Sequence, residues 1–186
     1  IPTIESTQPI KKDIDMDAQA LRACQQPLKE RYRDDPDTAL VPARAEAQLA
    51  DEEIACTLQT WSGDLVAGLH PAAGGDGSRA CSADMLLQGL AACAGVTLKS
   101  VATAMGIDLR PSRVIVEGHW DARGTLALDP EVPVGLRDVH LRFELDSDAD
   151  DAKLRKLIEL TERYCVIHQT LVSPPHQSVE FVRSIG

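Results

Sequence analysis

The sequence is poor in basic residues and lacks an unbroken apolar run of membrane length. Its 186 residues carry 29 acids against 19 bases, a formal net charge of −10, and this balance disfavours binding to nucleic acid or to anionic lipid. The longest mostly apolar stretch, residues 85–98, is interrupted by glycine and polar residues and is shorter than the ~20 residues of a membrane span. No charged segment followed by an apolar one opens the chain, so we expect a cytoplasmic protein.

Motifs of several enzyme classes are also absent. The sequence holds no G-x-S-x-G, no H-E-x-x-H and no phosphate-binding P-loop. Its five histidines are scattered, and no cysteine or histidine spacing resembles a structural zinc site. We therefore expect neither a metal nor a bound cofactor.

Two segments imitate ligand-binding motifs without their context. Residues 75–80 match G-x-G-x-x-A, but the dinucleotide fingerprint needs its first glycine at the end of a strand in a βαβ unit. Residues 146–151 begin like a calcium loop, but Asp151 and Leu157 stand where glycine and glutamate are required. We interpret the first segment as a loop and the second as acids at a helix N-terminus, where the helix dipole favours negative charge.

The cysteines indicate a reducing environment. There are five of them, an odd number, and no two form a C-x-x-C pair. A chain of this length needs no disulfide to hold its fold, so any disulfide is expected to be transient and redox-active. The cysteines are Cys24, Cys56, Cys81, Cys93 and Cys165.

Apolar periodicity predicts an α+β protein in which strands precede each of two helices. We expect an extended arm over residues 1–16 and a helix from Asp17 to Arg33, capped by Asp17. The expected strands span residues 43–49, 53–60, 64–69, 114–120, 124–128, 139–145 and 178–185. Because strands and then a helix occur twice in succession, the pattern favours antiparallel sheets over alternating βαβ units.

The two helices between these strands each carry a cysteine. Ten of the fourteen residues in 85–98 are apolar, so the helix predicted over 82–105 is apolar nearly all round and must be buried in a protein or an oligomer. Ser82 is expected to cap this helix and Gly106 to end it, with Cys93 in its middle. The second helix is predicted over 150–164, and Cys165 continues its apolar stripe.

Three segments, in this order, carry a family resemblance. They are residues 84–93, Asp-Met-Leu-Leu-Gln-Gly-Leu-Ala-Ala-Cys, the strand pair around 116–124, and residues 162–165, Glu-Arg-Tyr-Cys. Together they resemble the OsmC/Ohr family of thiol-dependent, hydroperoxide-reducing proteins. The resemblance implies an OsmC-like α+β fold with two central buried helices, formed by residues 41–186, and a homodimer. It leaves residues 1–40 outside the family core, as an arm and a helix.

The resemblance also implies a two-cysteine peroxidase acting on organic hydroperoxides. Cys93 would be the thiolate that attacks the O–O bond and becomes a sulfenic acid. Cys165 would resolve the sulfenic acid into a disulfide, which an external dithiol reductant later opens.

The reactive thiol needs a partner that favours its charged form. A thiol in the middle of an apolar helix has a raised pKa and gains nothing from the dipole of that helix, so we expect a cation beside it. In the family this cation is an arginine from the N-terminal hairpin, backed by an acid just before the reactive helix. By this resemblance the candidates are Arg44, on the first predicted strand, and Asp84. Arg79 and Arg163 are the alternative cations.

Two other functions stay open at this point. The chain could be a small-molecule binding or structural protein on the same fold, in which Cys93 and Cys165 are simply buried, as isolated cysteines among apolar residues usually are. It could also be a hydrolase or transferase with Cys93 as nucleophile, although no histidine is placed by the sequence to serve as its base.

Overall fold

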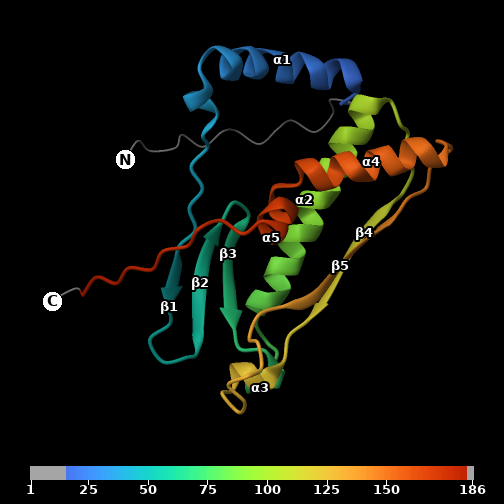
Figure 1. Cartoon of the computed structure of the whole chain (residues 1–186). Coiled ribbons are helices and arrows are strands. Elements are labelled where there is room, and N and C mark those ends of the chain that lie inside the picture. The colour runs from blue at the N-terminus through green and yellow to red at the C-terminus, as the bar shows by residue number, and fades with distance from the viewer. Residues whose placement is uncertain (1–15, 184–186) are drawn as a thin grey trace.

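The computed structural model describes residues 16–183, arranged as two antiparallel sheets around one long helix, α2 (Figure 1). The first sheet has the order β1-β2-β3, and the second pairs β4 with β5. The strands are β1 (Ala47–Leu49), β2 (Ala55–Thr60), β3 (Gly63–Gly68), β4 (Arg113–His119) and β5 (Arg137–Glu144). The helices are α1 (Ala18–Asp34), α2 (Ser82–Met105), α3 (Ala122–Thr125), α4 (Asp151–Tyr164) and α5 (Val166–Val172), with short 3-10 turns η1 (Pro36–Ala39) and η2 (Pro71–Ala73). The predicted α+β plan is confirmed.

Helix α2 spans the predicted residues and presents one continuous face to the core. Its buried residues Leu90, Ala94, Leu98 and Ala102 recur every four residues and therefore lie on one side. Gly106 ends the helix in the left-handed conformation, with φ of 66°, and its N–H reaches the carbonyl groups of the last turn. The expected cap is one residue off, because Cys81 and not Ser82 is the N-cap, and its side chain makes no capping bond.

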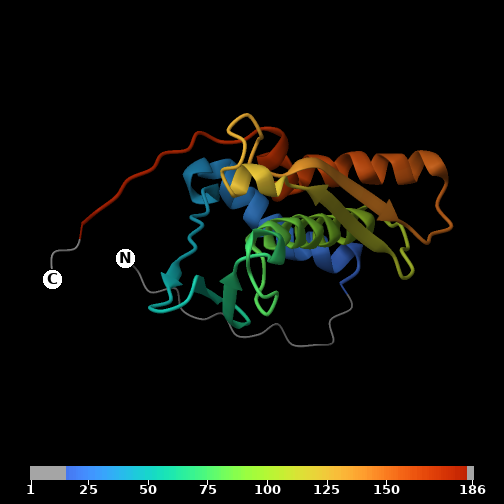
Figure 2. The same ribbon diagram turned by 90° about the horizontal axis from the view of Figure 1, so that it is seen from below.

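Helix α4 and the β4–β5 sheet cover the buried face of α2. The three-stranded sheet lies beside the N-terminal half of α2, whereas α4 crosses its C-terminal half (Figures 1 and 2). Leu98, Ala102 and Ile107 form one core cluster with Leu157 of α4. The hydroxyl group of Thr161, also buried, donates to the carbonyl of Leu157 at 2.8 Å, so the polar atom costs the core nothing unpaired.

The other side of α2 is largely open in this chain. Val96 is 73% exposed, and no atom lies within 4 Å of a Cβ built on Gly89. By length and composition alone α2 is apolar enough to cross a membrane, and 22% of that apolar window is buried within the chain. The same test is met by core helices of folded domains, so the exposed face is the feature that requires a cover.

Helix α1 confirms the helix predicted near the N-terminus. The Asp17 carboxylate accepts hydrogen bonds from the backbone N–H groups of Gln19 and Ala20, at 2.9 and 2.8 Å, and so caps it as expected. The helix begins beside the C-terminal end of α2 (Figure 1). Of the arm expected over residues 1–16, all but Met16 lies outside the described residues.

Three expectations for the strands are wrong. The first strand begins at Ala47 instead of residue 43. Residues 124–128 form no strand, because the Asp121 side chain accepts from the N–H of Arg123 and starts the short helix α3. Residues 178–183 are extended, but they pair with no strand in the described part of the chain, and residues 184–185 lie outside it. Val179 and Phe181 are consequently 99% and 90% exposed.

The core around α4 allows a stability prediction. Replacement of the buried Leu157 by Ala leaves a cavity between α2 and α4 and is expected to lower the free energy of unfolding by about 2–5 kcal/mol. The exposed Leu128→Ala is the matched control, expected to change it by less than about 0.5 kcal/mol. Urea denaturation followed by circular dichroism measures both. Equal stability of the two variants would show that α4 does not pack on α2 as described.

Candidate functional site

The structure brings Cys93 and Cys165 into contact, although they lie far apart in the sequence. Cys165 is fully buried in a cluster with Leu90 and Ala94 of α2, and Cys93 packs against the same cluster. The two sulfur atoms are also joined by a hydrogen bond. All five cysteines are free thiols, and this pair is the one that the core cluster unites.

Cys165 is fixed because it belongs to two helices at once. It follows the last residue of α4, and its N–H donates to the carbonyl of Thr161 at 2.9 Å. It also precedes the first residue of α5, and its sulfur accepts from the N–H of His168 at 3.5 Å, as an N-cap side chain does. The side chain therefore sits at the corner between the two helices.

The pKa values of the two thiols move in opposite directions. Burial raises the pKa of Cys93, but hydrogen bonds from the backbone N–H of Ile167 and from the Cys165 thiol outweigh it, so this pKa lies below its ordinary value. Burial raises the pKa of Cys165, and the neighbouring Cys93 raises it further. Cys93 is therefore the thiolate of the pair and Cys165 its protonated partner.

This arrangement corrects the argument that a cation must stand beside Cys93. Cys93 lies in the middle of its own helix but faces the first turn of another, α5, whose backbone N–H groups stabilise the thiolate. The sequence analysis missed α5. A signal for it does exist, because Pro174 and Pro175 follow the segment 166–172 and commonly mark the end of a helix.

The structure does not bring Arg44 or Asp84 to the cysteine pair within one chain. Arg44 precedes β1, is 75% exposed, and forms an ion pair with Glu46 at 2.5 Å. Asp84 lies in the first turn of α2, nine residues before Cys93. Nine residues are two and a half turns, about 13 Å along the axis, so the two side chains leave opposite faces of the helix.

The alternative arginines have other partners. Arg79 pairs with Glu53, and the Arg163 guanidinium lies 5.9 Å from the ring centre of Tyr164. Among residues 16–183, no group of three or more histidine, cysteine or acidic side chains could hold a metal ion.

An apolar cavity of about 520 Å³ opens next to the cysteine pair. Leu90 and Leu141 line it and also belong to the cluster that surrounds Cys165. The cavity therefore offers an apolar group a place close to the thiols. Its lining comes from α2, the segment before β5, β5, α4 and α5, and consists of Leu86, Leu87, Leu90, Leu136, Val139, Leu141, Glu162, His168, Leu171 and Val172.

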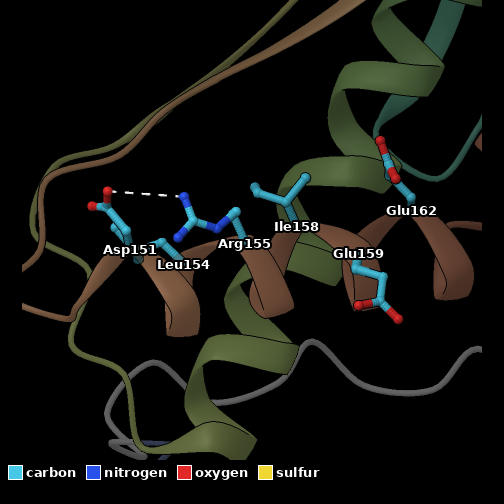
Figure 3. A pocket seen from close by; sticks show the side chains of 6 residues that line it. All are labelled: Asp151, Leu154, Arg155, Ile158, Glu159 and Glu162. Atoms are coloured by element: carbon cyan, nitrogen blue, oxygen red, sulfur yellow. Dashed lines mark ion pairs between the residues drawn. The ribbon is translucent and has the colours of Figure 1, made fainter.

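A second hollow, of about 410 Å³, runs along α4 (Figure 3). All six side chains that line it come from this one helix, and the ion pair between Arg155 and Asp151 spans 3.9 Å. It contains no thiol and no group that could activate one. We therefore do not assign the chemistry to this surface.

Comparison with known proteins agrees with the fold and identifies the class. Residues 75–180 match the family described as OsmC-like protein. Since this match covers more than half of the chain, the protein belongs to the OsmC-like family. The match begins later than residue 41, where the resemblance was expected to start. No curated protein matches the chain in sequence.

Solved structures share the architecture at low identity. The OsmC-like protein from Mycoplasma pneumoniae is 22% identical with a TM-score of 0.60, over 72% of this chain and 89% of that one. An OsmC-like protein of unknown function from Vibrio cholerae is 13% identical with a TM-score of 0.55, over 69% and 94%. The organic hydroperoxide resistance protein OsmC from Legionella pneumophila is 16% identical with a TM-score of 0.53, over 72% and 93%. These identities establish the fold.

The hydrogen bond between the thiols can be tested by substitution. Cys165→Ala removes the donor, so we expect the pKa of Cys93 to rise and its alkylation at neutral pH to slow. Cys165→Ser keeps an O–H donor at the same place and should raise the pKa less. Iodoacetamide labelling of Cys93 across a pH range, resolved by mass spectrometry, measures both. An unchanged profile in the alanine variant would mean that the two thiols do not interact.

Proposed function

We propose that this protein is a thiol-dependent peroxidase that reduces organic hydroperoxides, with Cys93 as the reactive and Cys165 as the resolving cysteine. The observation that carries the proposal is the contact between the two thiols, one favoured as thiolate and one as thiol. Membership of the OsmC-like family supports it, because one relative of the same fold is an organic hydroperoxide resistance protein.

The reaction uses the asymmetry of the pair. The Cys93 thiolate attacks the terminal oxygen of R–O–O–H, the O–O bond breaks, and R–O⁻ leaves and takes up a proton, which gives an alcohol and a sulfenic acid. The Cys165 sulfur then attacks the Cys93 sulfur and forms a disulfide with release of water. An external dithiol reductant restores both thiols, as suits a reducing cytoplasm, and no resident cofactor takes part.

The cavity supports an organic substrate over hydrogen peroxide. Eight of its ten lining residues are aliphatic, so an apolar R group gains free energy there, about 25 cal/mol for each Å² removed from water. Hydrogen peroxide has no such group and would gain nothing from these contacts.

The open face of α2 supports a homodimer. Val96 on this face and Val179 and Phe181 in the extended C-terminal segment expose more apolar surface than a monomer normally leaves uncovered. A second copy would cover it. It would also provide the one route by which Arg44 could act on Cys93, because within its own chain Arg44 is exposed and paired with Glu46.

The proposal predicts the fate of the thiols. One equivalent of cumene hydroperoxide should remove two thiols from each wild-type chain, none from Cys93→Ser, and leave Cys165→Ser with an oxidised Cys93 that cannot be resolved. Thiol titration and peptide mass spectrometry give these counts. A wild-type chain that keeps all its thiols would favour a binding protein with buried cysteines, and a lasting covalent adduct on Cys93 would favour an acyl-transfer enzyme.

Arg44 yields a prediction that depends on assembly. Arg44→Met should raise the pKa of Cys93 at concentrations at which the protein is dimeric, and leave it unchanged in the monomer. Each unit of rise corresponds to about 1.4 kcal/mol of lost thiolate stabilisation. Arg155→Met, an exposed arginine of α4, is the control. A profile that is unchanged at every concentration would remove Arg44 from the site.

A further inference from the structure

The resolving cysteine lies in surroundings that hold its proton. Cys165 is fully buried, and its neighbours from α2, β4 and β5 are aliphatic or aromatic apart from Cys93. A thiol must lose its proton before it can attack another sulfur, because the thiolate is the nucleophile. Burial and the adjacent Cys93 both raise the pKa of Cys165, so at neutral pH this proton needs an acceptor.

Two described groups near Cys165 could accept it. The titratable side chains that line the cavity are Glu162, on the last turn of α4, and His168, on the first turn of α5. The strand residues that surround Cys165, such as Leu141 and Phe143, do not titrate. Glu162 is exposed to solvent, whereas His168 is partly buried, so His168 is the better shielded of the two.

His168 is fastened on both sides of Cys165. Its backbone N–H donates to the Cys165 sulfur at 3.5 Å, and its ring Nδ1 lies 3.3 Å from the carbonyl oxygen of Glu162, three residues before Cys165. This is the position, three residues after the N-cap, from which a side chain reaches back over the cap residue. The ring is therefore held over the junction at which Cys165 sits.

The carbonyl of Glu162 also fixes the tautomer of His168. A carbonyl oxygen can only accept, so the proton of the neutral ring must be on Nδ1. The other nitrogen, Nε2, then carries a free lone pair. A neutral imidazole with a free Nε2 is a proton acceptor suited to neutral pH.

We propose that His168 is the base that takes the proton of the Cys165 thiol when the disulfide forms, directly or through one water of the cavity. This inference rests on the proposed function, and it adds a catalytic group that acts on the reacting sulfur. It concerns the second step alone, since Cys93 is already held as the thiolate.

The proton and electrons of this step balance. Nε2 of His168 takes the proton of the Cys165 S–H, and the resulting thiolate attacks the sulfur of the Cys93 sulfenic acid. The S–S bond forms as the S–O bond breaks, and the electron pair leaves with the oxygen as hydroxide. The imidazolium returns its proton to the hydroxide, which departs as water. The oxidant is the hydroperoxide consumed in the first step.

The alternative is that His168 merely caps α4. Its ring shares the Glu162 carbonyl with the side-chain amide of Gln169, which donates at 2.9 Å, so both side chains close the C-terminal turn of that helix. A suitable variant must keep this hydrogen bond and remove the base. His168→Asn does so, because its amide nitrogen can take the place of Nδ1 while nothing replaces Nε2.

The experiment separates the two oxidation steps in single-turnover reactions of the full chain with cumene hydroperoxide. A dimedone probe captures the Cys93 sulfenic acid, and quenched-flow mass spectrometry follows the Cys93–Cys165 disulfide. We expect His168→Asn to form the sulfenic acid at the wild-type rate and to form the disulfide at least tenfold more slowly, as loss of a general base typically does. Gln169→Ala, which loses a capping bond but no base, and Glu162→Gln, which loses the other candidate, should both form the disulfide within twofold of the wild-type rate.

The pH dependence distinguishes a base from a structural residue. The wild-type disulfide rate should level off once His168 is neutral, whereas that of His168→Asn should keep rising with pH as Cys165 loses its proton unaided. The groups that titrate around Cys165, namely Cys93, Glu162 and His168, are otherwise common to both proteins. If His168→Asn does not fold, His168→Gln, which also lacks a base, replaces it.

Each remaining outcome overturns the inference. A wild-type disulfide rate in His168→Asn would show that His168 takes no proton. A slow rate in Gln169→Ala or Glu162→Gln, equal to that of His168→Asn, would assign the effect to the helix cap or to Glu162. A wild-type chain that forms no sulfenic acid would overturn the proposed function itself, and this inference with it.

Discussion

The contact between the Cys93 and Cys165 thiols requires three helices to meet at one point. α2 must present Cys93 beside its buried face, α4 must end where α2 passes, and α5 must begin at once so that its N–H groups face the Cys93 sulfur. Each condition has a local cause: the four-residue repeat of buried side chains on α2, the buried Thr161 that accepts the N–H of Cys165, and the Cys165 sulfur that caps α5. The chemistry of the site depends on this corner.

The features set by short-range pattern could be predicted from the sequence. The bounds of α2, its end at Gly106 and the cap of α1 by Asp17 follow from periodicity and from residue types with local roles. The pairing of Cys93 with Cys165 came from the family resemblance, and the continued stripe of α4 placed Cys165 on the side of that helix that the structure buries.

The features that depend on tertiary context could not be predicted. Cysteine is a rare helix cap, so nothing in the sequence announced that Cys165 begins α5, and the source of thiolate stabilisation was sought in an arginine. Residues 178–183 alternate as a strand should, yet a strand also needs an edge to pair with, and the described chain offers them none. Asp121 favoured a turn of helix over the strand expected at 124–128 through a single side-chain bond.

The position of Cys165 at the corner of α4 and α5 has a thermodynamic consequence. A disulfide from this corner to Cys93 would enclose β4, α3, β5 and α4 in one covalent loop. In the chain-entropy model, closing a loop of that length restricts the unfolded state and adds about 4 kcal/mol of stability to the folded one. The oxidised form is then the more resistant to unfolding, and the same free energy opposes whichever dithiol reopens the loop.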